Sequence, residues 1–171
     1  MTERIRVIVM LAMTVVILGA VNSQIVDKDR TIRQGTTVLL RLRPKDPRSL
    51  MQGDYMALRY AITDAVAVAA NAARVNDGLV VIKLGYLDEA QFVSIYDGKD
   101  LRDGQFLLRF RKRGESVRIA SDAFFFEEGT GTLYDRARFG ELRVAENGDP
   151  VLTGLRDEEG IRLGESLHRL P

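Results

Sequence analysis

Apolar and polar residues alternate with a period of two along most of this chain. This period predicts β-strands, because the side chains of a half-buried strand point alternately to the core and to solvent. The alternation is clear over residues 36–43 and again over residues 54–62. The apolar positions of these two runs are Val38, Leu40, Leu42, Met56, Leu58, Tyr60 and Ile62. We expect two strands here, and we expect them to pair as the first hairpin of a β domain.

Similar runs and turn signals continue toward the C-terminus. Strands are predicted over residues 79–86, 91–96, 105–112, 116–120, 141–145 and 151–155. Asn147 and Gly148 supply the positive φ angles of the last hairpin. An alanine-rich stretch over residues 65–74 predicts a helix that Thr63 and Asp64 can cap. The expected fold class is mainly β with a minor α+β character: a compact antiparallel β domain of about eight strands with one or two short helices.

The N-terminal segment departs from this pattern because it is apolar on every side. Residues 7–21 carry no charge, and Arg4 and Arg6 precede them. A bilayer crossing needs about 20 residues, so residues 5–26 are predicted to form a short transmembrane helix. Charges at near-helical spacing over residues 24–34 predict that this helix continues outward from the bilayer.

Two alternatives to a membrane anchor stay open. A signal peptide cleaved after Ser23 would place Val21 and Ser23 at the recognition positions, and a buried helix would also be apolar. The N-terminal arginines favour a cytoplasmic end, because short positively charged tails stay on that side. The predicted layout is a cytoplasmic tip, anchor and juxtamembrane extension over residues 1–34. An extracytoplasmic β-rich domain over residues 35–171 then faces the periplasm or the outer face of the cell membrane.

The composition limits the possible functions. The chain has 171 residues, enough for one compact core beside an anchor. Its 25 basic and 24 acidic residues leave almost no net charge, so no global field attracts nucleic acid. Cysteine is absent, and the single histidine, His168, lies near the end of the chain. We predict no nucleic-acid partner, no metal site and no cofactor, and the sequence leaves the oligomeric state open.

The most specific stretch is the octapeptide Gly-Asp-Tyr-Met-Ala-Leu-Arg-Tyr over residues 53–60. It resembles the signature of the bacterial GDYXXLXY family at every fixed position, namely Gly53, Asp54, Tyr55, Leu58 and Tyr60. Residues 43–52 and 124–148 are similar to the family as well, so the resemblance extends over nearly the whole chain. It implies a small, single-anchor protein of the bacterial inner membrane without an assigned reaction, often associated with a polytopic membrane protein.

The predicted strand divides the motif between two faces. Leu58 and Tyr60 are expected in the core, whereas Gly53 and Asp54 form the turn that enters the strand. Residues on the outward face of this strand and on neighbouring strands form a candidate interaction surface. This surface consists of Tyr55, Arg59, Arg41, Arg43, Arg109 and Arg111. If the basic side chains bind a ligand, an anionic lipid or a cell-wall polymer fits them better than nucleic acid.

Two functions are consistent with these features. The main prediction is a non-enzymatic accessory subunit or binding module that acts with a polytopic membrane protein in the envelope. The alternative is a membrane-bound serine/lysine hydrolase resembling the signal-peptidase class, with Ser49 as nucleophile and Lys83 as general base. A buried lysine with a lowered pKa can deprotonate a serine. However, Ser49 lies closer to the Gly-Asp pair than in that class, and no arginine follows Lys83.

Overall fold

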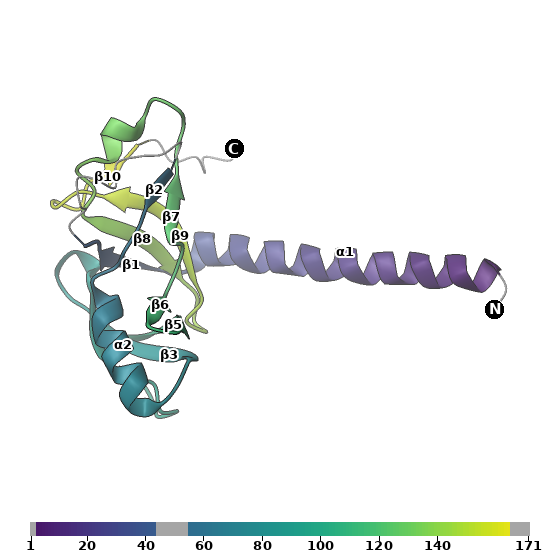
Figure 1. The fold of residues 1–171 in the computed structure, drawn as a ribbon, viewed down its shortest axis with the longest axis horizontal. Coiled ribbons are helices and arrows are strands. Elements are labelled where there is room, and N and C mark those ends of the chain that lie inside the picture. The colour runs from purple at the N-terminus through teal and green to yellow at the C-terminus, as the bar shows by residue number, and fades with distance from the viewer. Residues whose placement is uncertain (1–2, 44–54, 165–171) are drawn as a thin grey trace.

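One long helix joined to a folded domain makes up the computed structural model, which describes residues 3–43 and 55–164 (Figure 1). Helix α1 covers Glu3–Gln34 and projects away from the domain, with the N-terminus at its far end. At 1.5 Å per residue, its 32 residues extend over about 48 Å. The predicted continuation of the N-terminal helix to residue 34 is therefore confirmed.

The apolar side chains of α1 are exposed rather than packed against the domain. Val7, Ile8, Leu11, Val15, Val16, Ile17, Leu18 and Ile25 are among them. A helix that is apolar on all sides and unburied needs an apolar environment. α1 is long and apolar enough to cross a membrane, and a signal sequence near the N-terminus would share these properties. The helix is thus a candidate membrane span.

The described residues of the domain form three antiparallel sheets. The first has the order β1 (Thr36–Arg41), β8 (Phe139–Val144), β9 (Pro150–Arg156) and β10 (Arg162–Leu163). The second has the order β4 (Ala90–Ile95), β3 (Asp77–Leu84), β5 (Gln105–Arg113) and β6 (Ser116–Arg118). The third pairs β2 (Tyr55–Ala57) with β7 (Ala123–Phe125). The mainly β, antiparallel fold class is confirmed.

A single hydrophobic core connects these sheets. Helix α2 (Ile62–Ala73) packs across the second sheet through contacts with β4 and β6. Two short 3₁₀ helices, η2 (Tyr86–Asp88) and η3 (Gly131–Tyr134), complete the helical elements of the described residues. The core draws on all three sheets and includes Val38, Leu40, Met56, Leu58, Tyr60, Val80, Ile82, Leu108, Phe110 and Leu142. The motif strand therefore contributes to the same core as the two larger sheets.

The predicted last hairpin is present, whereas the predicted first hairpin is wrong. β8 pairs with β9 around Gly148, whose φ angle is 84°, and other consecutive predicted strands also pair, β3 with β4 and β5 with β6. In contrast, β1 pairs with β8 and β2 pairs with β7, so the first two strands belong to different sheets. Among the described residues, the segments just after these strands meet at the isolated antiparallel bridge between Leu42 and Tyr60. Alternation assigns side chains to faces but does not select the partner strand.

The predicted helix after the motif is present, but its cap is not. α2 begins at Ile62, before the predicted cap residues, and Ala61 at the N-cap makes no side-chain capping bond. The Thr63 hydroxyl instead donates a hydrogen bond of 2.6 Å to the carbonyl of Tyr60. The helix stops at Arg74, which adopts a left-handed conformation with φ 55°.

A tight turn joins α1 to β1. The Gly35 N–H donates to the Thr31 carbonyl at 2.9 Å, and the Arg143 guanidinium donates to the Gly35 carbonyl at 3.1 Å. A Cβ at position 35 would lie only 2.5 Å from the Thr31 carbonyl oxygen and 3.0 Å from that of Val144. Glycine thus lets the end of the helix pack directly on β8, without an intervening linker.

Candidate functional site

The described part of the family motif forms strand β2 and the turn that follows it. Tyr55 lies directly across from Phe125 on β7, and Met56 lies across from Phe124. Burial alternates along the motif: Met56, Leu58 and Tyr60 are buried, whereas their neighbours are exposed. The predicted division of the motif between an inward and an outward face therefore agrees with the structure.

The inward half of the motif holds the third sheet onto the core. The Leu58 N–H donates to the Asp122 carbonyl at 2.7 Å, and the Tyr60 hydroxyl donates to the Ser121 carbonyl at 2.9 Å. Burial raises the pKa of Tyr60, and the charge of Asp122 adds to that shift. A Cβ at Gly140 would lie 2.9 Å from the Tyr60 ring, so this glycine makes room for the ring. These contacts give Leu58 and Tyr60 a structural role.

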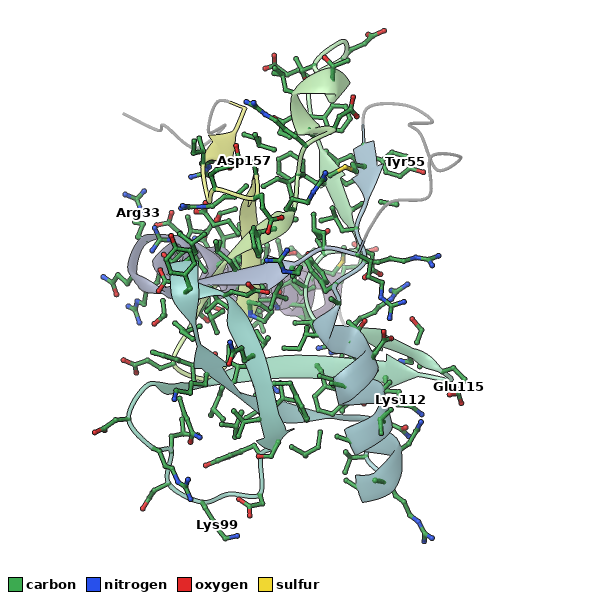
Figure 2. The ribbon with its side chains drawn as sticks, turned by 90° about the vertical axis from the view of Figure 1, so that its left-hand side faces the viewer. Arg33, Tyr55, Lys99, Lys112, Glu115 and Asp157 are labelled. Atoms are coloured by element: carbon green, nitrogen blue, oxygen red, sulfur yellow. The ribbon has the colours of Figure 1, made fainter. Side chains whose placement is uncertain are left out.

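The outward half carries an exposed aromatic pair. The rings of Tyr55 and Phe125 are 5.8 Å apart between centroids and tilted by 42°. Tyr55 is 41% exposed and Phe125 is 68% exposed. Arg59 is exposed on the same side of the alternating segment. In Figure 2, Tyr55 lies at the edge of the domain, far from the labelled Lys99, Lys112 and Glu115.

Phe125 owes its exposure to the alternation of β7. The neighbouring Phe124 and Phe126 both point inward and contact the Tyr134 ring, each at 5.1 Å between centroids. Phe125 therefore faces outward, opposite Tyr55. Sequence reasoning missed this residue as a surface candidate. The sequence does contain a signal for an exposed aromatic residue here, namely three consecutive phenylalanines, because a strand cannot bury all three on one face.

A comparison with protein families finds one match. The family model described as "GDYXXLXY protein" matches residues 17–155, which include the motif strand, β7 and the whole second sheet, whereas β10 of the first sheet lies beyond the match. The chain belongs to the GDYXXLXY family. Neither a curated protein nor a solved structure matches it. Family membership places the chain without assigning it a reaction.

Most of the predicted basic surface of this GDYXXLXY protein is engaged within the domain. Arg41 donates to Glu89 at 2.9 Å and to Glu158 at 3.0 Å, and its guanidinium lies 4.5 Å from the centre of the Phe139 ring. The hydrogen bond that Arg41 donates to Glu89 raises the pKa of Arg41 despite burial, and Glu158 adds to the shift. Arg41 thereby ties β1 to the turns after β3 and β9.

Two other predicted surface arginines are also ion-paired. Arg43 pairs with Asp64 at the start of α2, and Arg109 pairs with Asp149 in the turn between β8 and β9. Arg111 is exposed on β5, in a different sheet from the motif strand. The six predicted surface residues therefore do not form one patch. Of them, Tyr55 and Arg59 are both exposed at outward positions of the motif.

The remaining catalytic candidates gain no support from the described residues. Lys83 is exposed on β3, whereas a lysine base of the predicted kind would be buried. Ser49, Gly53 and Asp54 lie outside the described residues. Within residues 3–43 and 55–164, no three histidine, aspartate or glutamate side chains gather as ligands for a metal ion.

A buried carboxylate in the first sheet was not predicted. Glu141 on β8 is only 2% exposed, and it accepts a 2.7 Å hydrogen bond from Arg156. Arg162 lies 3.6 Å away on the other side, and the Thr153 hydroxyl lies 3.3 Å from the same carboxylate. Burial alone would raise the pKa of Glu141, but the Arg156 hydrogen bond and both arginine charges outweigh it, so the pKa is lowered. This cluster connects β8, β9 and β10.

Proposed function

We propose that this GDYXXLXY protein is a non-enzymatic, membrane-anchored accessory subunit that binds a polytopic membrane protein through its motif strand. The exposed Tyr55–Phe125 pair is the observation that supports this most directly. Aromatic side chains and arginine are enriched at protein–protein interfaces and at the residues that dominate binding energy. Arg59 supplies a cation on the same face as Tyr55. The docking face is therefore defined as Tyr55, Arg59 and Phe125.

The proposed layout places this face outside the cytoplasm. Residues 1–34 form the cytoplasmic tip, the anchor and a juxtamembrane extension, and residues 35–171 form the extracytoplasmic domain. The apolar, exposed surface of α1 supports an anchor, and the arginines at positions 4 and 6 support a cytoplasmic N-terminus in a bacterial inner membrane. A subunit anchored in the same bilayer meets its partner at a high effective concentration, so a small docking face is sufficient.

The motif itself favours a structural and binding role over catalysis. Its inward residues are hydrogen-bonded or packed in the core, and its outward residues Tyr55 and Arg59 form no nucleophile–base pair with the described residues around them. Interaction between proteins needs a shaped, exposed surface rather than a reactive group. The combination of a rigid inward half and an exposed aromatic half fits a docking element.

Photo-cross-linking in intact cells tests this docking face. A photoreactive phenylalanine analogue replaces Phe125 in the full-length chain, and Tyr86, which is 87% exposed on the 3₁₀ helix η2, serves as the matched control. We expect irradiation to give one adduct of higher mass at position 125 and none at position 86, with mass spectrometry identifying a polytopic protein. Equal adducts at both positions, or none at position 125, would show that the motif face is not the interface.

A further inference from the structure

The junction of α1 with the domain encloses a polar groove that neither the motif nor the proposed docking face uses. Its position follows from strand register. Thr36, the first residue of β1, pairs with Val144, the last residue of β8. The β8–β9 turn over residues 145–149 therefore extends past the start of β1 and lies alongside the last turns of α1. The space between them has a volume of about 890 Å³.

One face of α1 forms the first wall of this groove. Gln24, Asp27, Lys28, Thr31 and Gln34 line it, at the spacing of three and four residues that places helical side chains on one side. Arg30 also reaches the groove. Arg33 does not line it, and pairs instead with Asp29 at 2.9 Å. The base of α1 near Arg33 is visible in Figure 2.

The β8–β9 turn forms the second wall and is held in place. Its Gly148 carbonyl accepts a 2.8 Å hydrogen bond from the Arg109 N–H, and the Arg109 side chain pairs with Asp149. A Cβ on Gly148 would collide with Leu79 at 2.8 Å, so the turn packs closely on the second sheet. With Gly35 fixing the helix on the other side, both walls are preorganised. A preorganised site loses little entropy when a ligand binds.

The groove presents charges of both signs. Asp27, Lys28, Arg30 and Glu146 line it, and none of these four belongs to an ion pair among the described residues. All four are exposed to solvent. A third carboxylate, Asp149, also lines the groove but pairs with Arg109. The two cations and two anions that have no ion-pair partner among the described residues fit a ligand that carries both charges. Lys28 and Arg30 lie two residues apart and point in different directions from the helix, so either of them would bind a phosphate, and Asp27 or Glu146 would bind an ammonium group.

The depth of the groove in the bilayer points to the ligand's source. Residues 7–26 carry no charge, and a helix over them is about 30 Å long, the thickness of a hydrocarbon core. Asp27 and Lys28 then lie at the level of the lipid headgroups. We propose that this juxtamembrane groove binds the headgroup of a zwitterionic phospholipid that has a phosphate and a primary ammonium group. The inference rests on the membrane anchor in the proposed function.

Lipid retention by the full-length protein tests the site. The protein is placed in nanodiscs that contain equal amounts of phosphatidylethanolamine, phosphatidylcholine and phosphatidylglycerol, and retained lipids are counted by native mass spectrometry. We expect phosphatidylethanolamine to be retained about tenfold more strongly than either competitor, the effect of one charge-assisted hydrogen bond. Glu146→Gln should abolish this preference, because it removes a carboxylate assigned to the primary ammonium group that both competitors lack. Arg30→Gln should lower the retention of all three lipids, because each of them has a phosphate. Arg33→Gln removes the same charge from the same helix outside the groove and should leave retention unchanged.

Three results would contradict the proposed lipid site. Equal retention of the three lipids would reduce the groove to an ordinary lipid contact. Preference for phosphatidylglycerol, or an equal loss in Arg33→Gln, would show a diffuse basic surface. Two further measurements, carbonate extraction of membranes and the intact mass of the protein, distinguish failure of the lipid site from failure of the membrane anchor on which it rests. A chain that leaves the membrane, or that begins after Ser23, overturns both proposals, whereas an anchored full-length chain without headgroup preference overturns the lipid site alone.

Discussion

Replacing Tyr60 with alanine is expected to lower the free energy of unfolding of the domain by about 3–5 kcal/mol. The ring is only 3% exposed and lies in the core beside the backbone of Gly140. Alanine would leave a cavity there, because Gly140 has no side chain with which to fill the space. It would also remove the hydrogen bond to Ser121. Denaturant unfolding of the full-length protein in detergent, followed by circular dichroism, measures the loss.

Two further variants separate packing from surface effects in the same motif. Tyr60→Phe keeps the ring and should cost about 1 kcal/mol, the usual value of one hydrogen bond. Tyr55→Ala removes an exposed ring and should change stability by no more than about 0.5 kcal/mol. If Tyr55→Ala destabilised the domain as much as Tyr60→Ala, both halves of the motif would be structural. The docking face would then lose its support.

Replacing Glu141 with alanine is expected to cost about 3 kcal/mol, because it leaves the Arg156 and Arg162 charges without their shared partner. Both arginines keep about a third of their side chains exposed and can turn toward water, which holds the loss at the lower end for a broken buried pair. Glu158→Gln is the matched control, since Glu158 is an exposed carboxylate whose partner Arg41 keeps Glu89. A loss no greater than that of Glu158→Gln would contradict a stabilising cluster.

The lowered pKa of Glu141 also implies that the stability of the domain depends on pH. Its pKa in the folded protein lies below the ordinary value of 4.5. A carboxyl with a depressed pKa contributes stability above its unfolded pKa and loses that contribution as the pH falls through the folded pKa. The free energy of unfolding of the wild type should therefore fall with pH below about 4.5. In Glu141→Gln that slope should be shallower. Parallel pH profiles would show that other carboxylates govern acid unfolding.

Local sequence patterns predicted the faces of strands better than their partners. The alternation in residues 55–60 and the position of the last hairpin turn each depend on neighbouring residues, and both match the structure, although Gly148 has the predicted positive φ angle and Asn147 does not. The first hairpin failed because β1 pairs with β8, whose residues lie about a hundred positions later in the chain. Only the register of Thr36 against Val144 creates the juxtamembrane groove. Pairing between strands so far apart in the sequence cannot be recognised from the local pattern of residues.

For the candidate sites, too, the sequence predicted exposed positions better than contacts between distant residues. Tyr55 and Arg59 could be placed on the outward face from alternation alone, but their aromatic neighbour Phe125 comes from a distant strand. Arg41 and Arg109 looked available in the sequence because their acidic partners are remote from them. Glu141 carried a weak signal, since it is the only acidic residue of a strand whose other members are apolar except Arg143. Its partner Arg156 could not be inferred without the β8–β9 register.

Co-purification of the full-length protein tests the proposed accessory role most directly. The chain is tagged at its C-terminus, native membranes are solubilised in mild detergent, and proteins present in stoichiometric amount are identified by mass spectrometry. We expect one polytopic membrane protein, lost when Tyr55 and Phe125 are both changed to alanine and retained in Tyr86→Ala. A chain that purifies alone, or a partner retained equally by all three forms, would contradict an accessory subunit that docks through the motif strand.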